Sequence, residues 1–141
     1  MHEKVHYIKR PSYLGLREED AAIWERFMGM FPVEYDAVIY NLHIGAGAEI
    51  PENTEGVVAS DFKLLTQYKI DVVAFKGDRT DIIELKPNAG TSAIGQVQNY
   101  AILYQRDIDD RGVPQAVIIT DRERPDMKFL TKNAGVKLII V

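Results

Sequence analysis

The sequence predicts an α/β domain with a mixed central β-sheet flanked by helices. The main observation is the order of the apolar patterns, which follow one another as helix, strand, strand, strand, helix, strand, then helix, strand. A hairpin makes the first half of the sheet antiparallel, whereas helical crossovers connect the later strands. One domain covering residues 1–141 accounts for the whole pattern.

The composition fits this prediction. The chain has 141 residues, of which 46% are hydrophobic and 27% charged, and that is enough to form a hydrophobic core without cross-links. It has no cysteine, which excludes disulfides and thiolate metal sites. The N-terminal stretch lacks the apolar core of a signal peptide, and no apolar run approaches the roughly 20 residues that span a bilayer. We therefore expect a cytoplasmic protein with no membrane partner.

The first half of the chain begins with a helix over residues 17–30, which Pro32 ends. One face of this helix carries Ile23, Phe27 and Met30. A strand is expected over residues 36–44, where alternate residues should share one face: Val38, Tyr40, Leu42 and Ile44. Residues 45–60 are rich in glycine and then acidic, and are expected to form a loop.

The remaining elements follow at regular intervals. They are two strands near 67–75 and 80–86, a helix over 91–105, a strand over 114–120, a short helix over 125–133 and a final strand over 136–141. Apolar residues mark the core side of the longer helix: Ile94, Val97, Ala101 and Tyr104. Gly135 follows the end of the short helix.

The hairpin around Gly77-Asp78 brings charged residues together. A two-residue or four-residue loop at this turn gives the same register, in which Phe75 faces Thr80 and Val73 faces Ile82. In the same register Asp71 faces Glu84, and Lys86 lies two residues further along the same face.

Two opposed carboxylates destabilise a sheet, because like charges about 5 Å apart repel by roughly 3 kcal/mol at an effective dielectric constant near 20. A divalent cation between Asp71 and Glu84 reverses this energy, and hard oxygen ligands suit Mg²⁺. Lys86 would then offset the carboxylates, or position and activate a water. The alternative is structural: Asp71 begins a strand at the solvent face, and Glu84 and Lys86 form an ordinary exposed strand pattern.

The following helix adds polar candidates. Gln96 and Tyr100 are four residues apart and therefore share one helical face, with Asn99 on the same polar edge. The alternative is that Gln96 is solvated and Tyr100 is a half-buried packing residue.

Together these residues resemble the PD-(D/E)xK nuclease superfamily. Asp71 followed after a hairpin by Glu84-Leu85-Lys86 is similar to its signature, although Ile70 stands where the signature has proline. Gln96 and Tyr100 resemble the QxxxY motif of its RecB-like branch, and the order of elements resembles its restriction-endonuclease-like core. The likeness covers residues 17–120.

This resemblance implies metal-dependent hydrolysis of phosphodiester bonds. Asp71, Glu84 and the backbone carbonyl of Leu85 would bind Mg²⁺ or Mn²⁺, and Lys86 would orient the attacking water. Gln96 would contact Lys86, the water or the DNA backbone, and Tyr100 would contact a phosphate. The family also has an acidic residue in its first helix, for which Glu18, Glu19 and Glu25 are the candidates here, with Glu19 favoured because it shares the face of the apolar residues.

The predicted function is a nuclease acting on DNA in replication, repair, recombination or the DNA processing of a phage or mobile element. The alternative is a nuclease-fold domain that binds DNA or assembles with a protein partner or a second copy without catalysis. The net charge of −4 and the lack of a basic stripe favour that alternative, whereas opposed carboxylates favour catalysis.

Overall fold

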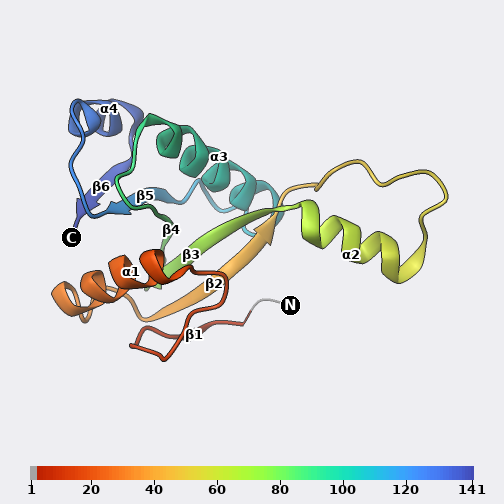
Figure 1. Ribbon diagram of the computed structural model, residues 1–141, viewed down its shortest axis with the longest axis horizontal. Coiled ribbons are helices and arrows are strands. Elements are labelled where there is room, and N and C mark those ends of the chain that lie inside the picture. The colour runs from red at the N-terminus through yellow and green to blue at the C-terminus, as the bar shows by residue number, and fades with distance from the viewer. Residues whose placement is uncertain (1–2) are drawn as a thin grey trace.

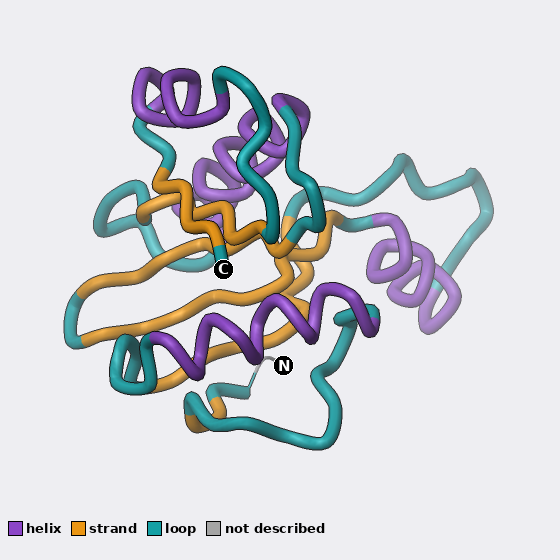
Figure 2. Tube along the Cα trace, turned by 60° about the vertical axis from the view of Figure 1, so that its left-hand side comes forward, coloured by secondary structure: helices purple, strands orange, loops and turns teal. Residues whose placement is uncertain are grey.

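The computed structural model describes residues 3–141 and consists of one six-stranded sheet with helices on both faces (Figures 1 and 2). The elements in chain order are β1 (Val5–His6), α1 (Glu18–Met30), β2 (Ala37–Ile44), α2 (Gly56–Thr66), β3 (Tyr68–Lys76), β4 (Arg79–Leu85), α3 (Thr91–Asp107), β5 (Gln115–Thr120), α4 (Met127–Ala134) and β6 (Lys137–Ile140). The strands lie in sequence order. The pairs from β1 to β4 are antiparallel, and β4, β5 and β6 are parallel. The predicted mixed α/β fold is confirmed.

Each face of the sheet has its own core. The apolar side of α1 packs on one face, against side chains such as Val72, Ile83 and Val117. The predicted face of α3 packs on the other, together with Met127 of α4, against side chains such as Val73 and Ile82. β4 and β5 are therefore covered on both sides, which explains the almost continuous apolar sequence of β5. None of the helices among residues 3–141 has the length and apolarity that crossing a bilayer would need.

The buried stripe of α1 differs from the prediction. Ile23 and Phe27 are buried as expected, but Met30 is 57% exposed, and Trp24 and Met28 are buried instead. The helix buries two adjacent rows of side chains, Ile23 with Phe27 and Trp24 with Met28, and the two residues of each row are about one turn apart. Trp24 contributes a buried polar contact as well, because its Nε1 donates a hydrogen bond to the Tyr40 hydroxyl at 2.8 Å.

The predicted alternation along β2 is wrong beyond Tyr40. Val38 and Tyr40 face α1, whereas Leu42 and Ile44 belong to the core under α3. Asn41 separates the two pairs and has a positive φ of 57°. A left-handed residue inside a strand interrupts the alternation, so the side chains after it point to the opposite face.

Residues 45–60 are not one continuous loop, because α2 begins at Gly56. We call residues 46–67 the arm; in Figure 1 they project away from the sheet. This helix could not be predicted from the apolar pattern of the sequence, because α2 buries none of its residues and so lacks a core-facing stripe. Val57, Val58 and Leu65 are exposed, and the arm has four acidic residues against one lysine. This charge argues against the arm as a phosphate-binding surface.

Tyr35 and Asp81 form a buried polar pair at the hairpin end of the sheet. The Tyr35 hydroxyl donates to Asp81 Oδ2 at 2.7 Å, while Asp81 Oδ1 has no hydrogen-bond partner. The nearest cation is Arg79, whose Nε lies 3.6 Å from Asp81 Oδ2. Asp81 is only 2% exposed, so the carboxylate relies on these two contacts.

We expect Tyr35→Phe to lower the free energy of unfolding by about 1–3 kcal/mol, because it leaves a buried carboxylate oxygen without its donor. Urea denaturation measures the change. Tyr68→Phe is the matched control, because Tyr68 is largely exposed, and it should change stability by no more than about 0.5 kcal/mol. Equal effects of the two changes would contradict a structural role for the Tyr35–Asp81 contact.

Candidate active site

The hairpin between β3 and β4 has the predicted register. Gly77 turns the chain with a φ of +56°, and Phe75 pairs with Thr80 and Val73 with Ile82. The last pair of the ladder is Val72 with Ile83, so the same register places Asp71 opposite Glu84. Beyond this point β3 continues beside β2 alone, because β4 ends at Leu85.

A polar pocket of about 460 Å³ lies where β3 and β4 separate. Five predicted residues are involved: Asp71, Glu84, Leu85, Lys86 and Gln96 all line it. The Leu85 backbone N–H donates a hydrogen bond to Asp71 Oδ2 at 2.9 Å, which ties the end of β4 to β3.

Tyr100 lies beside this pocket rather than in its wall. Its hydroxyl accepts a hydrogen bond from Gln96 Nε2 at 2.7 Å, so the two predicted residues of α3 act as a pair. Tyr100 is buried and lines a neighbouring hollow that it shares with Gln96. The buried Tyr100 ring thus holds its hydroxyl in a position that orients the Gln96 amide.

The switch in β2 helps to shape the pocket. Asn41 lies opposite Asp71 in the β2–β3 register, where the ladder has no direct pair, and lines the same pocket. β3 switches at the same level, because Val72 packs toward α1 and Ile70 toward α3. Asp71 therefore lies where the side chains of both central strands change faces. Its pocket is lined by residues from the helices on both faces of the sheet.

Burial dominates the electrostatics of the carboxyl pair. It raises the pKa of both Asp71 and Glu84 above the ordinary carboxyl range, and the charge of Asp71 raises the pKa of Glu84 further. The Leu85 N–H acts in the opposite direction, because it stabilises the charged form of Asp71 and lowers its pKa. Glu84 Oε2 is buried and has no hydrogen-bond partner. An ionised pair is thus unfavourable here unless a cation joins it.

The donor set fits a hydrated divalent cation. Two carboxyl groups and the Leu85 carbonyl are hard oxygen ligands, and the unpartnered Glu84 Oε2 has a free coordination position. Among residues 3–141 no cluster of three or more His, Cys, Asp or Glu side chains is arranged to bind a metal by itself. An ion at this pair would therefore complete its shell with waters and with oxygens of a bound phosphate, as Mg²⁺ commonly does.

The carboxyl pair should make stability depend on pH. A folded-state pKa above the unfolded value means that the folded protein holds the proton more tightly, so stability falls as pH rises. For Glu84 this fall should extend from about pH 5 to about pH 9. We expect Glu84→Gln to be more stable than the wild type in EDTA, with a difference that grows across this range, as measured by urea denaturation at several pH values. A difference that does not change with pH would contradict a raised pKa of Glu84.

The first helix contributes an acidic residue that the sequence did not single out. Asp20 lines the pocket, and its charge raises the pKa of both Asp71 and Glu84. Of the three predicted candidates, Glu19 lines the pocket, Glu18 does not, and Glu25 accepts a hydrogen bond from the Tyr13 hydroxyl at 2.9 Å elsewhere. Asp20 precedes the buried Trp24 by four residues, so the helical period identifies it once Trp24 is known to be buried.

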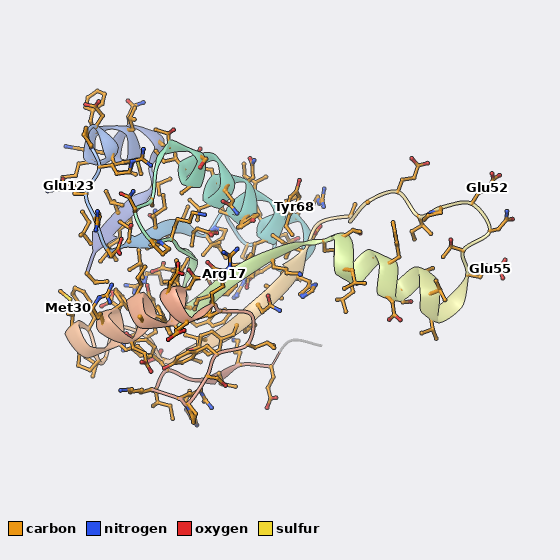
Figure 3. All side chains as sticks on the ribbon, viewed as in Figure 1. Arg17, Met30, Glu52, Glu55, Tyr68 and Glu123 are labelled. Carbon is orange, nitrogen blue, oxygen red and sulfur yellow. The ribbon has the colours of Figure 1, made fainter. Side chains whose placement is uncertain are left out.

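Three cations surround the carboxyl groups. Arg17, Lys69 and Lys86 line the pocket, and none of them is within 4.0 Å of a carboxylate in the part of the chain that the structure describes. Arg17 lies at the start of α1 (Figure 3). Arg17 and Lys69 were not predicted from the sequence, although Lys69 stands two residues before Asp71 in the same strand.

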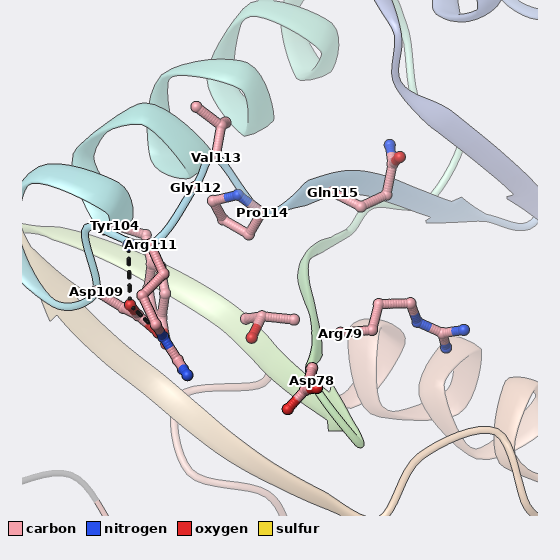
Figure 4. Close-up of a pocket in the computed structure, with 10 residues that line it drawn as sticks. Asp78, Arg79, Tyr104, Asp109, Arg111, Gly112, Val113, Pro114 and Gln115 are labelled. Atoms are coloured by element: carbon pink, nitrogen blue, oxygen red, sulfur yellow. Dashed lines mark hydrogen bonds and ion pairs between the residues drawn. The ribbon is translucent and has the colours of Figure 1, made fainter.

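A second pocket lies at the other end of the hairpin, between the β3–β4 turn and the segment that leads into β5 (Figure 4). It is lined by charged residues that include Asp78, Arg79, Asp109 and Arg111. Arg111 Nη2 lies 2.7 Å from Asp109 Oδ2, and Arg79 pairs with Glu34 at 3.1 Å. Because its cations are neutralised by near neighbours, this pocket offers no comparable chemistry.

Comparison with known proteins identifies the fold. A solved structure of EndoMS in complex with double-stranded DNA matches 95% of this chain and 48% of the EndoMS chain, with a TM-score of 0.50 and 15% sequence identity. The chain has a nuclease-like fold, with a restriction-endonuclease-like core. At this identity the likeness concerns the fold alone.

A second solved structure resembles the chain more weakly. A protein of unknown function, AF1548, matches 84% of this chain and 52% of its own with 20% identity and a TM-score of 0.44. The chain thus spans about half the length of each matched structure. No family model and no curated protein matches the sequence.

Proposed function

We propose that this protein is a metal-dependent nuclease that hydrolyses phosphodiester bonds in DNA. The observation that carries the proposal is the placement of Asp71 opposite Glu84, with a buried, unpartnered Glu84 oxygen, in a pocket that Lys86 also lines. A protein selected for stability alone gains nothing from this arrangement, because the two carboxyl groups raise each other's cost of ionisation.

Each residue has a defined role. Asp71, Glu84 and the Leu85 carbonyl would hold Mg²⁺ or Mn²⁺, which when bound lowers the pKa of a water ligand and neutralises charge on the phosphate. Lys86 donates hydrogen bonds to the attacking water and to a phosphate oxygen. Gln96 contacts Lys86, the water or the substrate backbone, and Tyr100 fixes the orientation of the Gln96 amide through their 2.7 Å hydrogen bond.

The rim of the pocket supports a polyanionic substrate. Arg17, Lys69 and Lys86 line the same pocket as the carboxyl pair and are free to bind phosphates there. The EndoMS structure contains double-stranded DNA, and the shared fold supports nucleic acid as the ligand here as well. We further propose that the chain belongs to the RecB-like branch of the PD-(D/E)xK superfamily and acts in replication, repair, recombination or the processing of phage or mobile-element DNA.

A cleavage assay tests the proposal. Purified protein is incubated with plasmid DNA and with single-stranded oligonucleotides in Mn²⁺, Mg²⁺ or EDTA, with Lys86→Ala as the inactive control. We expect cleavage products only with the wild type and only when Mn²⁺ or Mg²⁺ is present. The absence of cleavage with every metal and substrate would overturn the proposal.

A second candidate is a nuclease-fold domain that serves protein assembly. The arm favours it, because Val57, Val58 and Leu65 expose apolar surface next to acidic residues, a combination that suits a protein partner or a second copy better than DNA. If the wild type forms an oligomer in sedimentation experiments, Val58→Glu with Leu65→Glu dissolves it, and no nucleic acid is cut, this candidate replaces the first.

A further inference from the structure

We propose that the hollow between the start of β3 and α3 binds an unpaired nucleobase of the nucleic acid held at the candidate active site. This inference rests on the nuclease proposed above and names the kind of substrate. The hollow has a volume of about 510 Å³ and is lined by Tyr68, Gln96, Asn99, Tyr100, Ile102 and Leu103. Gln96 also lines the pocket that contains Asp71 and Glu84, so the hollow adjoins the candidate active site.

The Tyr68 ring is the stacking surface. It is 59% exposed, although its centroid lies only 5.8 Å from that of Tyr100, at an interplanar angle of 46°. Figure 3 shows Tyr68 beside α3, where the arm leaves the sheet. An exposed aromatic ring next to a phosphate-binding site is the usual platform on which proteins stack the bases of a single strand.

The backbone of Gly45 supports the Tyr68 ring from below. Gly45 has a φ of +90°, and a Cβ added to it would lie 3.2 Å from Cδ2 of Tyr68, so its backbone lies directly against the ring. The Gly45 amide donates to Asp107 Oδ2 at 2.8 Å, and its carbonyl accepts from Gln67 Nε2 at 2.6 Å. A ring supported in this way loses little conformational freedom when a base stacks on it.

The rest of the wall suits the edge of a base. Gln96, Asn99 and Leu103 recur at intervals of three and four residues, so they form one row along α3 that leads from the carboxyl pair to Tyr68. The amides of Gln96 and Asn99 each offer donors and an acceptor, as base edges do. Ile102 and Leu103 provide apolar contact.

An unpaired base is required because stacking on Tyr68 needs a free face. In a continuous duplex both faces of each base are covered by its neighbours, and the base edge is paired. We therefore expect the enzyme to prefer single-stranded nucleic acid, or a strand end that opens, over a fully paired duplex. The preference should depend on the Tyr68 ring and not on its hydroxyl.

Oligonucleotide binding tests the inference. The fluorescent adenine analogue 2-aminopurine, whose emission is quenched by stacking, is moved along a single strand relative to the position that the wild type cuts. Binding is measured in Ca²⁺ after a gel has shown that the strand stays intact. We expect quenching at one or two positions with the wild type and Tyr68→Phe, and none with Tyr68→Ala. An abasic nucleotide at the quenched position should weaken wild-type binding by about 5- to 150-fold.

A double-mutant cycle gives the decisive result. Tyr68→Ala should weaken single-strand binding by a similar factor and should bind the abasic strand no more weakly than the intact one. Phe129→Ala is the matched control, because Phe129 is also an exposed aromatic residue but lies on α4, and it should bind like the wild type. Melting temperatures show whether each variant folds. If Tyr68→Ala does not fold, the site is still tested by comparing the binding of Tyr68→Phe to the intact strand and to the abasic strand.

Several outcomes would overturn the inference. If the wild type binds and cuts but Tyr68→Ala binds equally well, or if Tyr68→Ala weakens binding to a paired duplex as much as to a single strand, Tyr68 does not stack on a base and the nuclease proposal stands. If the wild type neither binds nor cuts nucleic acid, the nuclease proposal fails and the base site fails with it.

Discussion

Lys86→Ala is expected to lower the rate of DNA cleavage by about 10²–10³-fold while leaving the fold intact. Lys86 follows the end of β4 and lines the same pocket as the two carboxyl groups, but its side chain is exposed to solvent. Its removal therefore takes a positioned ammonium group away from the reacting phosphate without opening a cavity. An exposed Lys-to-Ala change alters stability by no more than about 0.5 kcal/mol.

The rate of DNA cleavage and the melting temperature are both measured for the wild type and for Lys86→Ala. Lys132→Ala is the control, because Lys132 is exposed on α4 and lines no part of the candidate active site. Full activity in Lys86→Ala would mean that the active site has been assigned to the wrong residues. Lost activity with a large fall in melting temperature would make Lys86 a structural residue instead.

The second large effect concerns metal binding at Asp71. An ion that binds only the folded protein, at about 100 times its dissociation constant, adds about 2.7 kcal/mol of stability. For a domain of this size that corresponds to a rise in melting temperature of about 5–10 °C. We expect Mn²⁺ or Mg²⁺ to produce this rise in the wild type and little or none in Asp71→Asn.

The metal-free comparison separates binding from damage to the fold. Burial raises the pKa of Asp71, so removal of this ionisable group should leave the variant at least as stable as the wild type in EDTA above neutral pH. The asparagine carbonyl can still accept the hydrogen bond from the Leu85 amide. Identical melting shifts with metal in both proteins would argue against a site at this carboxyl pair.

Local rules were sufficient for the hairpin and for α3. Alternation and a glycine turn determine which residues of β3 and β4 face one another, so the Phe75–Thr80 and Val73–Ile82 pairs followed from the sequence. The same reasoning brought Asp71 and Glu84 together. The helical period placed Ile94, Val97, Ala101 and Tyr104 in the core. Each of these predictions depends on residues close together in the chain.

Local rules failed where a distant segment decides the conformation. No periodicity predicts the left-handed Asn41 in the middle of β2, which reverses the faces of Leu42 and Ile44. The arm helix was missed for the opposite reason, since α2 buries none of its residues and therefore has no core-facing stripe.

The sequence by itself determined the order of the elements other than β1 and α2, the mixed sheet and the cross-strand placement of Asp71 and Glu84, because turn geometry and side-chain alternation act over a few residues. Only the tertiary structure decided which other charges surround this pair. Arg17 and Asp20 enter the pocket from the start of α1, which is separated from β3 in the chain by β2 and α2. Gln96 enters from α3 on the opposite face. Their positions depend on how two helices pack on the two faces of one twisted sheet, and that packing is set by contacts between residues far apart in the chain.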